Sequence, residues 1–202
     1  MGATGKMGSA IAKGLAQTKK YRLLLMANDQ AKLNNLKHRL ESAGSPAEID
    51  ILMCAKEASW EADVIILATP YEAERNIAEK IREVATGKVV ISVSNPPDNA
   101  FPGLATSPTT SGAEQLQRLL PDSRIVKAFN TVPAANFETR LIGSRQVDSF
   151  IAGNNSDAVD LVAEIVASIG LNPVVAGDLS ASRTLERVQS PLIQTNLKHL
   201  PT

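Results

Sequence analysis

The stretch GATGKMGSAIAKGLA, residues 2–16, decides the fold class. It predicts a glycine turn that leads directly into a helix, because its glycines precede apolar residues at helical spacing. The usual dinucleotide fingerprint is G-x-G-x-x-G between a strand and a helix. If Gly5 and Gly8 are the last two glycines, Ala3 takes the place of the first. Gly5 would let the backbone approach a pyrophosphate that faces the first amides of the helix. The turn alone does not establish nucleotide binding, because an ordinary helix start rich in small residues has the same sequence pattern.

Such a turn requires a strand before it, and only Met1 precedes Gly2. We therefore expect that a short apolar first strand of roughly five residues is missing from the chain. In a doubly wound sheet that strand is central. Its loss would leave two rows of backbone groups unpaired, which is costly where they are buried, and would lower the affinity for a nucleotide.

Apolar runs then alternate with amphipathic stretches, and continuous Val/Ile runs favour strands that are covered on both faces. This order predicts an α/β, Rossmann-type doubly wound, mostly parallel sheet in a single domain over residues 1–202. Residues 178–202 form a small C-terminal helical extension with a bend near Pro191. A proline-rich loop over residues 95–111 interrupts the pattern. We expect strands at residues 21–28, 48–53, 62–70, 88–97, 123–130, 148–153 and 172–177, and helices at residues 29–44, 72–87, 113–120, 156–170 and 180–200.

Composition excludes several classes of function. Lys+Arg and Asp+Glu both number 21, and a neutral chain without a basic run gives no reason to expect a nucleic-acid partner. Cys54 is the only cysteine, so neither an internal disulfide nor a metal site is expected. The apolar runs are too short to span a bilayer and no signal peptide is visible, which favours a cytoplasmic protein without a membrane partner. The apolar segment SPLIQTNL, residues 190–197, suggests a possible homodimer.

The end of the strand predicted at residues 21–28 bears on the choice of cofactor. NAD-dependent enzymes usually place an acid there, which binds the ribose hydroxyls. Here Ala27 and Asn28 occupy that position, and Lys32 in the next helix is within reach of a 2′-phosphate. Asp29 fits an N-cap better than a ribose ligand. We therefore predict NADP(H), preferred modestly over NAD(H), although Lys32 also fits an ordinary solvated helix lysine.

Two further strand ends carry small, polar and proline residues. Thr69, Pro70 and Tyr71 follow one strand, and Asn95 lies at the end of the next. In doubly wound sheets, ligands bind beyond the carboxyl ends of the strands. Three such strand ends together predict a nucleotide-binding crevice.

Four segments, spread nearly from one end of the chain to the other, resemble the family of NADP oxidoreductases that depend on the deazaflavin coenzyme F420. The segments KAFNTVPA and AGDLSASRTLE are the specific ones. The resemblance implies a Rossmann fold and hydride exchange between NADP(H) and F420, or a flavin as the second redox partner. The four segments are GATGKMGSAIAKGLA at residues 2–16, ADVIILATPYE at 62–72, SRIVKAFNTVPAANFE at 123–138 and IAGNNSDAVDLVAEIVASIGLNPVVAGDLSASRTLE at 151–186.

The resemblance also implies roles for individual residues. A first group would hold the pyrophosphate, the adenosine phosphate and the nicotinamide side of NADP(H), beside Gly5 of the glycine motif and Asn95 of the strand end: Thr4, Lys6, Met7, Ala27, Asn28, Lys32, Thr69, Pro70 and Tyr71. A second group would lie where the ring of the second cofactor meets the nicotinamide, with the small Ala134 next to it: Asn130, Thr131, Val132 and Pro133, and Ser182 and Leu185, which would close the crevice. The family commonly has Ser-Arg where this chain has Ala27-Asn28, which weakens the predicted NADP preference.

Two other readings remain open from the sequence. One is an NADP(H)-binding redox sensor without a second substrate. The other is an NmrA-like or short-chain reductase, which needs a tyrosine and a lysine four residues apart; the nearest spacing here is Tyr71 with Arg75. Exchange of a hydride between two cofactors needs positioning rather than an acid–base dyad. No catalytic side chain is therefore assigned, and neither His38 nor His199 has a catalytic setting.

Overall fold

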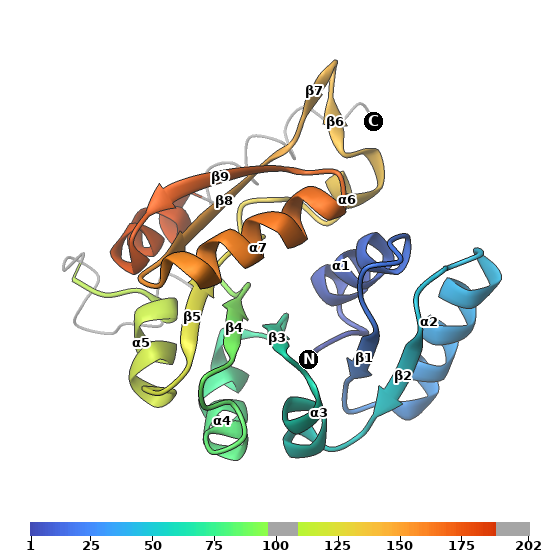
Figure 1. The fold of residues 1–202 in the computed structure, drawn as a ribbon, viewed down its shortest axis with the longest axis horizontal. Helices are drawn as coiled ribbons and strands as arrows, with labels where there is room; N and C mark the ends of the chain where they lie inside the picture. Colours follow the sequence, from blue (N-terminus) through green and yellow to red (C-terminus); the bar gives the residue numbers. More distant parts are fainter. Residues whose placement is uncertain (97–108, 189–202) are drawn as a thin grey trace.

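The computed structural model describes residues 1–96 and 109–188. It shows an α/β fold in which helices cover both faces of a mostly parallel sheet (Figure 1). The strands are β1 (Leu23–Met26), β2 (Ile49–Leu52), β3 (Val64–Leu67), β4 (Val89–Ser92), β5 (Arg124–Lys127), β6 (Leu141–Ile142), β7 (Arg145–Gln146), β8 (Asp148–Gly153) and β9 (Asn172–Gly177). The helices are α1 (Lys6–Ala16), α2 (Gln30–Ser42), α3 (Ala55–Glu61), α4 (Tyr71–Ile81), α5 (Gly112–Leu119), α6 (Asn136–Thr139), α7 (Ser156–Ser168), the 3₁₀ turn η1 (Leu179–Ala181) and a helix over residues 182–188.

The main sheet has the order β3-β4-β5-β8-β9. β3, β4 and β5 are parallel, β8 runs antiparallel to β5, and β9 is parallel to β8. β4 has cores on both faces, because Val89 and Ile91 pack into the core formed with α1 and α7, whereas Val90 packs into the core formed with α4 and α5. This burial on both faces explains why the strand reads as a continuous apolar run and confirms the predicted fold class.

β1 and β2 form a separate parallel pair, and no strand of the described chain lies between β1 and β3. Residues 1–3 connect the two sheets at their carboxyl ends. The Met1 amino group donates to Ile66 O at 2.6 Å, the Ala68 amide donates to Met1 O at 3.1 Å, and the Ala3 amide donates to Met26 O at 3.1 Å. The sheet is thus interrupted where the sequence predicts a first strand, and the N-terminus lies beside this interruption (Figure 1).

A cavity of about 460 Å³ occupies the interruption, and we call it the slot. Its walls are the facing strands β1 and β3, helix α1, and residues of α3 and α7. The slot therefore extends below the glycine turn, away from the carboxyl ends of β4 and β5.

Several elements differ from the sequence prediction. Helix α3 and the β6–β7 hairpin were not predicted, because each is short and α3 has only two fully buried residues. The helix expected over residues 72–87 ends at Ile81. The predicted proline-rich loop lies largely outside the described residues, as do the bend at Pro191 and the apolar segment 190–197.

Candidate functional site

The glycine turn packs directly against the end of β3. Gly2 has a φ of +73°, and a Cβ on it would lie 2.3 Å from Ala68 O. A Cβ on Gly8 would lie 2.0 Å from Gly2 O, so these two positions accept only glycine. Gly5, whose amide donates to Gly2 O at 3.0 Å, is exposed, and a Cβ on it would lie 3.3 Å from Gly2 O, a tight contact that requires only a small shift.

The start of α1 is open to an anion. Its N-cap residue, Gly5, makes no side-chain capping bond, and the first turn carries no acidic residue. The first amides of a helix have no intrahelical partner and lie at the positive end of the helix dipole. This helix start therefore suits a diphosphate that approaches the backbone at Gly5.

Buried polar atoms without partners lie at the carboxyl ends of β3 and β5. Within residues 1–96 and 109–188, no hydrogen-bond partner is found for Thr69 Oγ1 after β3, or for Asn130 Oδ1 and Thr131 Oγ1 after β5. A buried polar group without a partner costs about 1–3 kcal/mol, so such groups are rare in folded proteins. Their concentration at the ligand edge of a doubly wound sheet fits a polar ligand such as a dinucleotide.

The chain turns sharply where it leaves β5. Phe129 has a φ of +64°, and its buried ring lies 5.9 Å, centroid to centroid, from that of Phe137. A left-handed backbone in a bulky residue is strained and persists where packing imposes it, most often at functional sites. The turn directs Asn130 across to the end of β4, where its Nδ2 donates to Asn95 Oδ1 at 2.9 Å.

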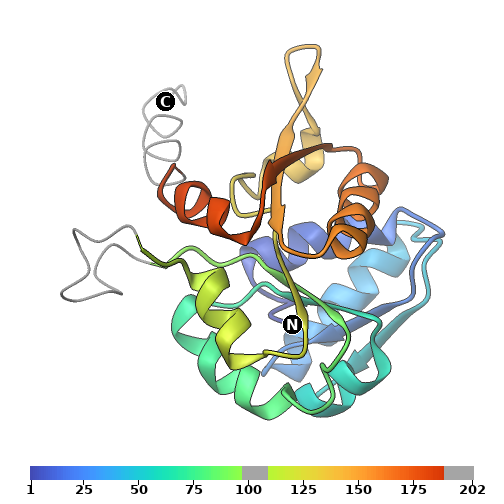
Figure 2. The same ribbon diagram turned by 60° about the vertical axis from the view of Figure 1, so that its left-hand side comes forward.

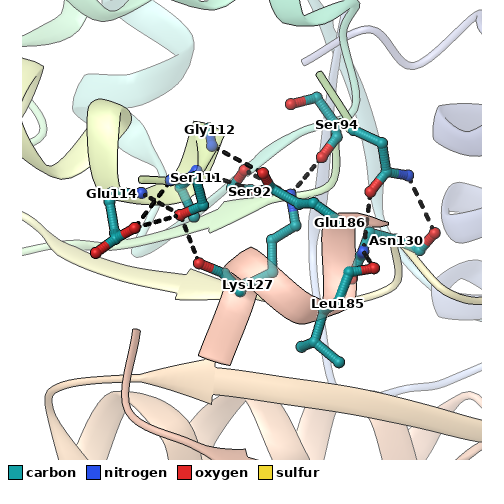
Figure 3. Close-up of polar contacts among 12 residues, drawn as sticks. Ser92, Ser94, Ser111, Gly112, Glu114, Lys127, Asn130, Leu185 and Glu186 are labelled. Carbon is teal, nitrogen blue, oxygen red and sulfur yellow. Dashed lines mark hydrogen bonds and ion pairs between the residues drawn. The ribbon is translucent and has the colours of Figure 1, made fainter. Parts of the chain in front are cut away.

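The side-chain amide of Asn130 also bonds the C-terminal helix to the carboxyl end of the sheet. Asn130 Nδ2 also donates to Leu185 O at 3.0 Å, and Asn95 Nδ2 donates to Asn130 O at 3.2 Å (Figure 3). Loops that are far apart in the sequence thus form one hydrogen-bonded unit beside the polar atoms described above. Figure 2 shows the helix that begins at residue 182 lying across the top of α5 and the end of the sheet.

A buried ion pair lies beneath that unit. The side chains of Lys127 and Glu186 are 0% and 7% exposed, and Lys127 Nζ lies 2.8 Å from Glu186 Oε1. Lys127 also donates to Ser94 O, while Glu186 accepts the amides of Gly112 at 2.8 Å and Ala113 at 3.2 Å (Figure 3). Glu186 therefore binds both a buried cation and the N-terminus of α5. Sequence reasoning missed this pair, and the only available signal was a lysine within the apolar run SRIVKAFN.

A second ion pair fixes the outer side of the same helix. Arg183 contacts Glu114 at 2.5 Å, and Glu114 completes a capping box with Ser111 at the start of α5. The Ser182 hydroxyl lies 2.6 Å from that of Ser111. The start of α5 and the C-terminal helix are thus joined by several polar contacts rather than by apolar packing alone.

Glu74 on α4 is a buried carboxyl that sequence reasoning also missed. It is 3% exposed, and its Oε1 has no hydrogen-bond partner among the described residues. Burial raises the pKa of Glu74 to about 7; the Ser94 hydroxyl and the Lys127 ammonium partly offset this rise, and Glu186 adds to it. The carboxyl group is therefore about half protonated at neutral pH.

We expect Glu74 to make the protein less stable as the pH rises. A carboxyl whose pKa is higher in the folded than in the unfolded state binds an extra proton on folding, so its contribution is complete below pH 4.5 and is lost as the pH rises to about 7. Across the whole interval between these two pKa values, Glu74 changes the free energy of unfolding by at most about 3 kcal/mol. The check is urea unfolding of the native protein and Glu74→Gln at pH 5 and pH 8. Glu74→Gln should lose less stability over this interval, and equal losses in both proteins would contradict the assignment.

The structure brings most of the predicted nucleotide residues to the same edge. Thr4, Gly5, Lys6 and Met7 form the turn and the start of α1. Thr69, Pro70 and Tyr71 follow β3, and the Tyr71 hydroxyl donates to Gln115 Oε1 at 2.7 Å. Ala27 and Asn28 follow β1. These placements agree with the expected layout of a dinucleotide site, while the contacts themselves stay predictions.

At the start of α2, Asp29 is the N-cap that the sequence predicts. Its Oδ1 accepts the Lys32 amide at 3.0 Å. Lys32 Nζ lies 3.2 Å from Asp29 Oδ2 and is largely exposed, so it is free to turn toward a phosphate at little cost. His38 is exposed on the same helix, as expected.

Four of the residues predicted for the second cofactor are buried: Asn130, Val132, Ser182 and Leu185. Val132 is in the main core, Leu185 is buried, and the Ser182 hydroxyl donates to Leu179 O. Only Thr131, Pro133 and Ala134 are partly exposed. Val132, Ser182 and Leu185 would therefore act on a bound ring mainly by shaping the backbone around it.

Comparison with known proteins identifies the family. Residues 2–96 match the sequence pattern of a family described as NADP oxidoreductase, coenzyme F420-dependent. A protein named F420-dependent NADP reductase, from Methanocaldococcus jannaschii, is 31% identical over 206 aligned positions, which cover 98% of this chain and 92% of the relative. The chain belongs to the F420-dependent NADP oxidoreductase family. It is accordingly an NADP-dependent oxidoreductase.

Solved structures agree with the fold. A hypothetical protein from Sinorhizobium meliloti is 31% identical, with a TM-score of 0.71 over 88% of this chain and 83% of the other. A structure from Arthrobacter sp. FB24, assigned as an F420-dependent NADP reductase, has a TM-score of 0.76 at 22% identity over 95% of this chain and 89% of the other, which supports the fold. Within the described part of this family member, no helix is long and apolar enough to cross a membrane.

Proposed function

We propose that this chain transfers a hydride between NADP(H) and coenzyme F420 at the carboxyl ends of β3, β4 and β5. The observation that carries the proposal is the cluster of partnerless buried polar atoms of Thr69, Asn130 and Thr131 beside the uncapped start of α1. The name of the Methanocaldococcus relative supports the pair of cofactors. The two cofactors supply the carbons between which the hydride passes, and when NADPH is the donor the reduced F420 also takes up one proton, which comes from the solvent.

The chain contributes binding and alignment. The first amides of α1 hold the diphosphate, and Gly5 allows its close approach. Thr69 lies at the end of β3, with its hydroxyl positioned to bind the nicotinamide side of the dinucleotide. No carboxylate besides the N-cap Asp29 stands at the end of β1, and Lys32 partly neutralises it, which supports a modest preference for a 2′-phosphate.

The second ring is assigned to the turn after β5. The Asn95–Asn130–Leu185 hydrogen bonds hold this turn rigidly against the end of β4. The partly exposed Thr131, Pro133 and Ala134 offer small side chains that leave room for a flat ring. Hydride transfer requires reacting atoms about 3–3.5 Å apart, so this rigidity serves the reaction more than a titrating group would.

A pair of bulky substitutions tests the position of the second ring. We expect Ala134→Trp to reduce F420 reduction by NADPH at least about a hundredfold, because about 1 Å of misplacement costs that much, while NADPH affinity stays within about twofold. The matched control is Ala135→Trp, whose side chain is exposed on the neighbouring position. Both variants are first checked for an unchanged thermal midpoint.

Equal turnover in the two tryptophan variants would place the second ring elsewhere. The same assay with FMN and FAD as acceptors decides between F420 and a flavin. If NADPH binds but no acceptor is reduced, the chain is a dinucleotide sensor and the proposed reaction is wrong.

A further inference from the structure

Glu74 is a buried carboxyl group that the proposed contacts with the two cofactors do not use. Along β4, Val90 packs against α4 and α5, and because side chains alternate along a strand, Ser94 points to the same face of the sheet. The Ser94 hydroxyl and the Lys127 ammonium both act on the Glu74 carboxyl group. Glu74 therefore lies beneath the carboxyl end of β4, on the side of the sheet that α4 and α5 cover.

A cavity of about 160 Å³ lies on the other side of Glu74, between α4 and α5. It is large enough for several water molecules. Glu74 lines it together with Glu72 and Arg75, which are both exposed, so the cavity lies close to the surface of the protein. The Glu74 carboxyl group can therefore exchange a proton with solvent from beneath the sheet, whether or not a cofactor covers the ends of the strands.

The charged groups around Glu74 come from three elements. Lys127 on β5 and Glu186 on the C-terminal helix form an ion pair at 2.8 Å, so their charges offset one another (Figure 3). On α4 itself, burial raises the pKa of the Tyr71 hydroxyl above its usual value, so that group stays protonated near neutral pH. Arg75 and Glu72 are exposed and therefore screened by solvent.

The net charge of this buried cluster therefore depends on Glu74. The part of α5 that lines the cavity has no charged side chain, and β4 contributes the Ser94 hydroxyl. With Glu74 protonated, the cluster of Glu74, Lys127 and Glu186 is neutral, and with Glu74 ionised it carries one negative charge. Burial raises the pKa of Glu74 to about 7, so both forms are populated near neutral pH.

The two oxidation states of the dinucleotide differ in the charge of the nicotinamide ring. The ring of NADP⁺ carries a positive charge, whereas the ring of NADPH is neutral. The proposed function places this ring beyond the carboxyl ends of β3 and β4, on the strand end beneath which Glu74 lies. Attraction between a buried carboxylate and a cation is screened much less than attraction between two exposed charges.

We propose that Glu74 makes the binding site distinguish the two oxidation states of the cofactor: its carboxylate form favours NADP⁺, and its protonated form favours NADPH. Binding of NADP⁺ then breaks the O–H bond of the protonated carboxyl group. The electron pair stays on the carboxylate, and the proton leaves to solvent water through the cavity between α4 and α5. The inference rests on the proposed position of the nicotinamide, but not on the identity of the second cofactor.

The test is isothermal titration of the full chain with NADP⁺ and with NADPH at pH 5.5 and pH 8.5. The ratio of the two dissociation constants is compared, because the 2′-phosphate titrates in both cofactors and cancels in the ratio. From pH 5.5 to pH 8.5 we expect the ratio to shift in favour of NADP⁺ by at least about threefold, since the ionised carboxylate attracts the cationic ring. Glu74→Gln, which stays neutral, should show a shift below about 1.5-fold. The matched control is Glu72→Gln, which removes an exposed carboxylate from the same helix and should behave as the native protein.

A second measurement uses the native protein alone. Titrations at pH 7 in buffers with different heats of ionisation give the number of protons released on binding, and NADP⁺ should release at least about 0.2 proton per site more than NADPH. Equal proton release by the two cofactors, or a native pH shift of the ratio in Glu74→Gln, would overturn the proposal. Because F420 is absent from both measurements, their failure would leave the proposed hydride transfer intact, and a failure of F420 reduction would not alter their result.

Discussion

Replacing Gly5 with valine is expected to weaken NADPH binding by at least about a hundredfold while the chain stays folded. A hundredfold loss corresponds to about 2.7 kcal/mol. The physical reason is that Gly5 is exposed and a Cβ on it would lie 3.3 Å from Gly2 O, a tight contact that requires only a small shift, and 4.0 Å from Ala68 O, so the rest of the valine side chain projects into the space where the diphosphate approaches α1. The measurement is isothermal titration with NADPH, together with the thermal midpoint of each variant.

Two comparisons make this result specific. Ala43→Val adds a valine at the exposed end of α2, far from the turn, and should leave NADPH affinity unchanged. Gly8→Ala should instead unfold the turn, because its Cβ would lie 2.0 Å from Gly2 O. A folded Gly5→Val protein that binds NADPH normally would show that the dinucleotide does not use this helix start.

Replacing Glu186 with alanine is expected to destabilise the protein by about 3–5 kcal/mol, the usual cost of leaving one charge of a buried ion pair uncompensated. Lys127 would keep only uncharged hydrogen-bond acceptors, with the partly protonated Glu74 as the remaining carboxyl near its ammonium, and the Gly112 and Ala113 amides of α5 would lose their carboxylate acceptor. Because the C-terminal helix would lose its main contact with β5, F420 reduction should fall further than NADPH affinity. Urea unfolding and steady-state kinetics measure the two effects.

We expect the uncompensated charge on Lys127, rather than the absence of the ion pair, to cause most of this loss of stability. The double variant Lys127→Met with Glu186→Gln removes both charges and keeps an acceptor for the α5 amides, so it should recover most of the stability. Lys13→Ala is the exposed counterpart. It breaks an ion pair with Glu138 at 2.8 Å on the surface and should cost less than about 1 kcal/mol. If Glu186→Ala is no more destabilising than Lys13→Ala, the buried pair does not hold the helix.

Local patterns in the sequence predict the fold class because they depend on neighbouring residues. The glycine turn, the apolar run of β4 and the N-cap at Asp29 all express short-range rules, and the structure agrees with each. The buried network could not be predicted in the same way. Lys127 and Glu186 lie on different elements far apart in the chain, and their meeting depends on how the C-terminal helix packs.

In the candidate site, too, some features are predictable from the sequence and others are visible only in the structure. The sequence places Thr69, Asn95 and Asn130 at the ends of strands, and the structure brings Asn95 and Asn130 into direct hydrogen bonding. The sequence does not reveal that Val132 turns into the core, because the left-handed turn at Phe129 changes the direction of the chain there. Glu74 is also hidden from sequence reasoning, since a glutamate in an amphipathic helix ordinarily faces water.

Transfer of isotope from NADPH labelled with deuterium at C4 of the nicotinamide tests the central claim most directly. The full chain is mixed with labelled NADPH and F420, and the reduced F420 is analysed by mass spectrometry. The account predicts that the label of one C4 position moves to F420 without exchange with solvent, one equivalent for each NADPH consumed. Reduced F420 that carries only solvent hydrogen, or NADPH that binds without reducing F420, would contradict it.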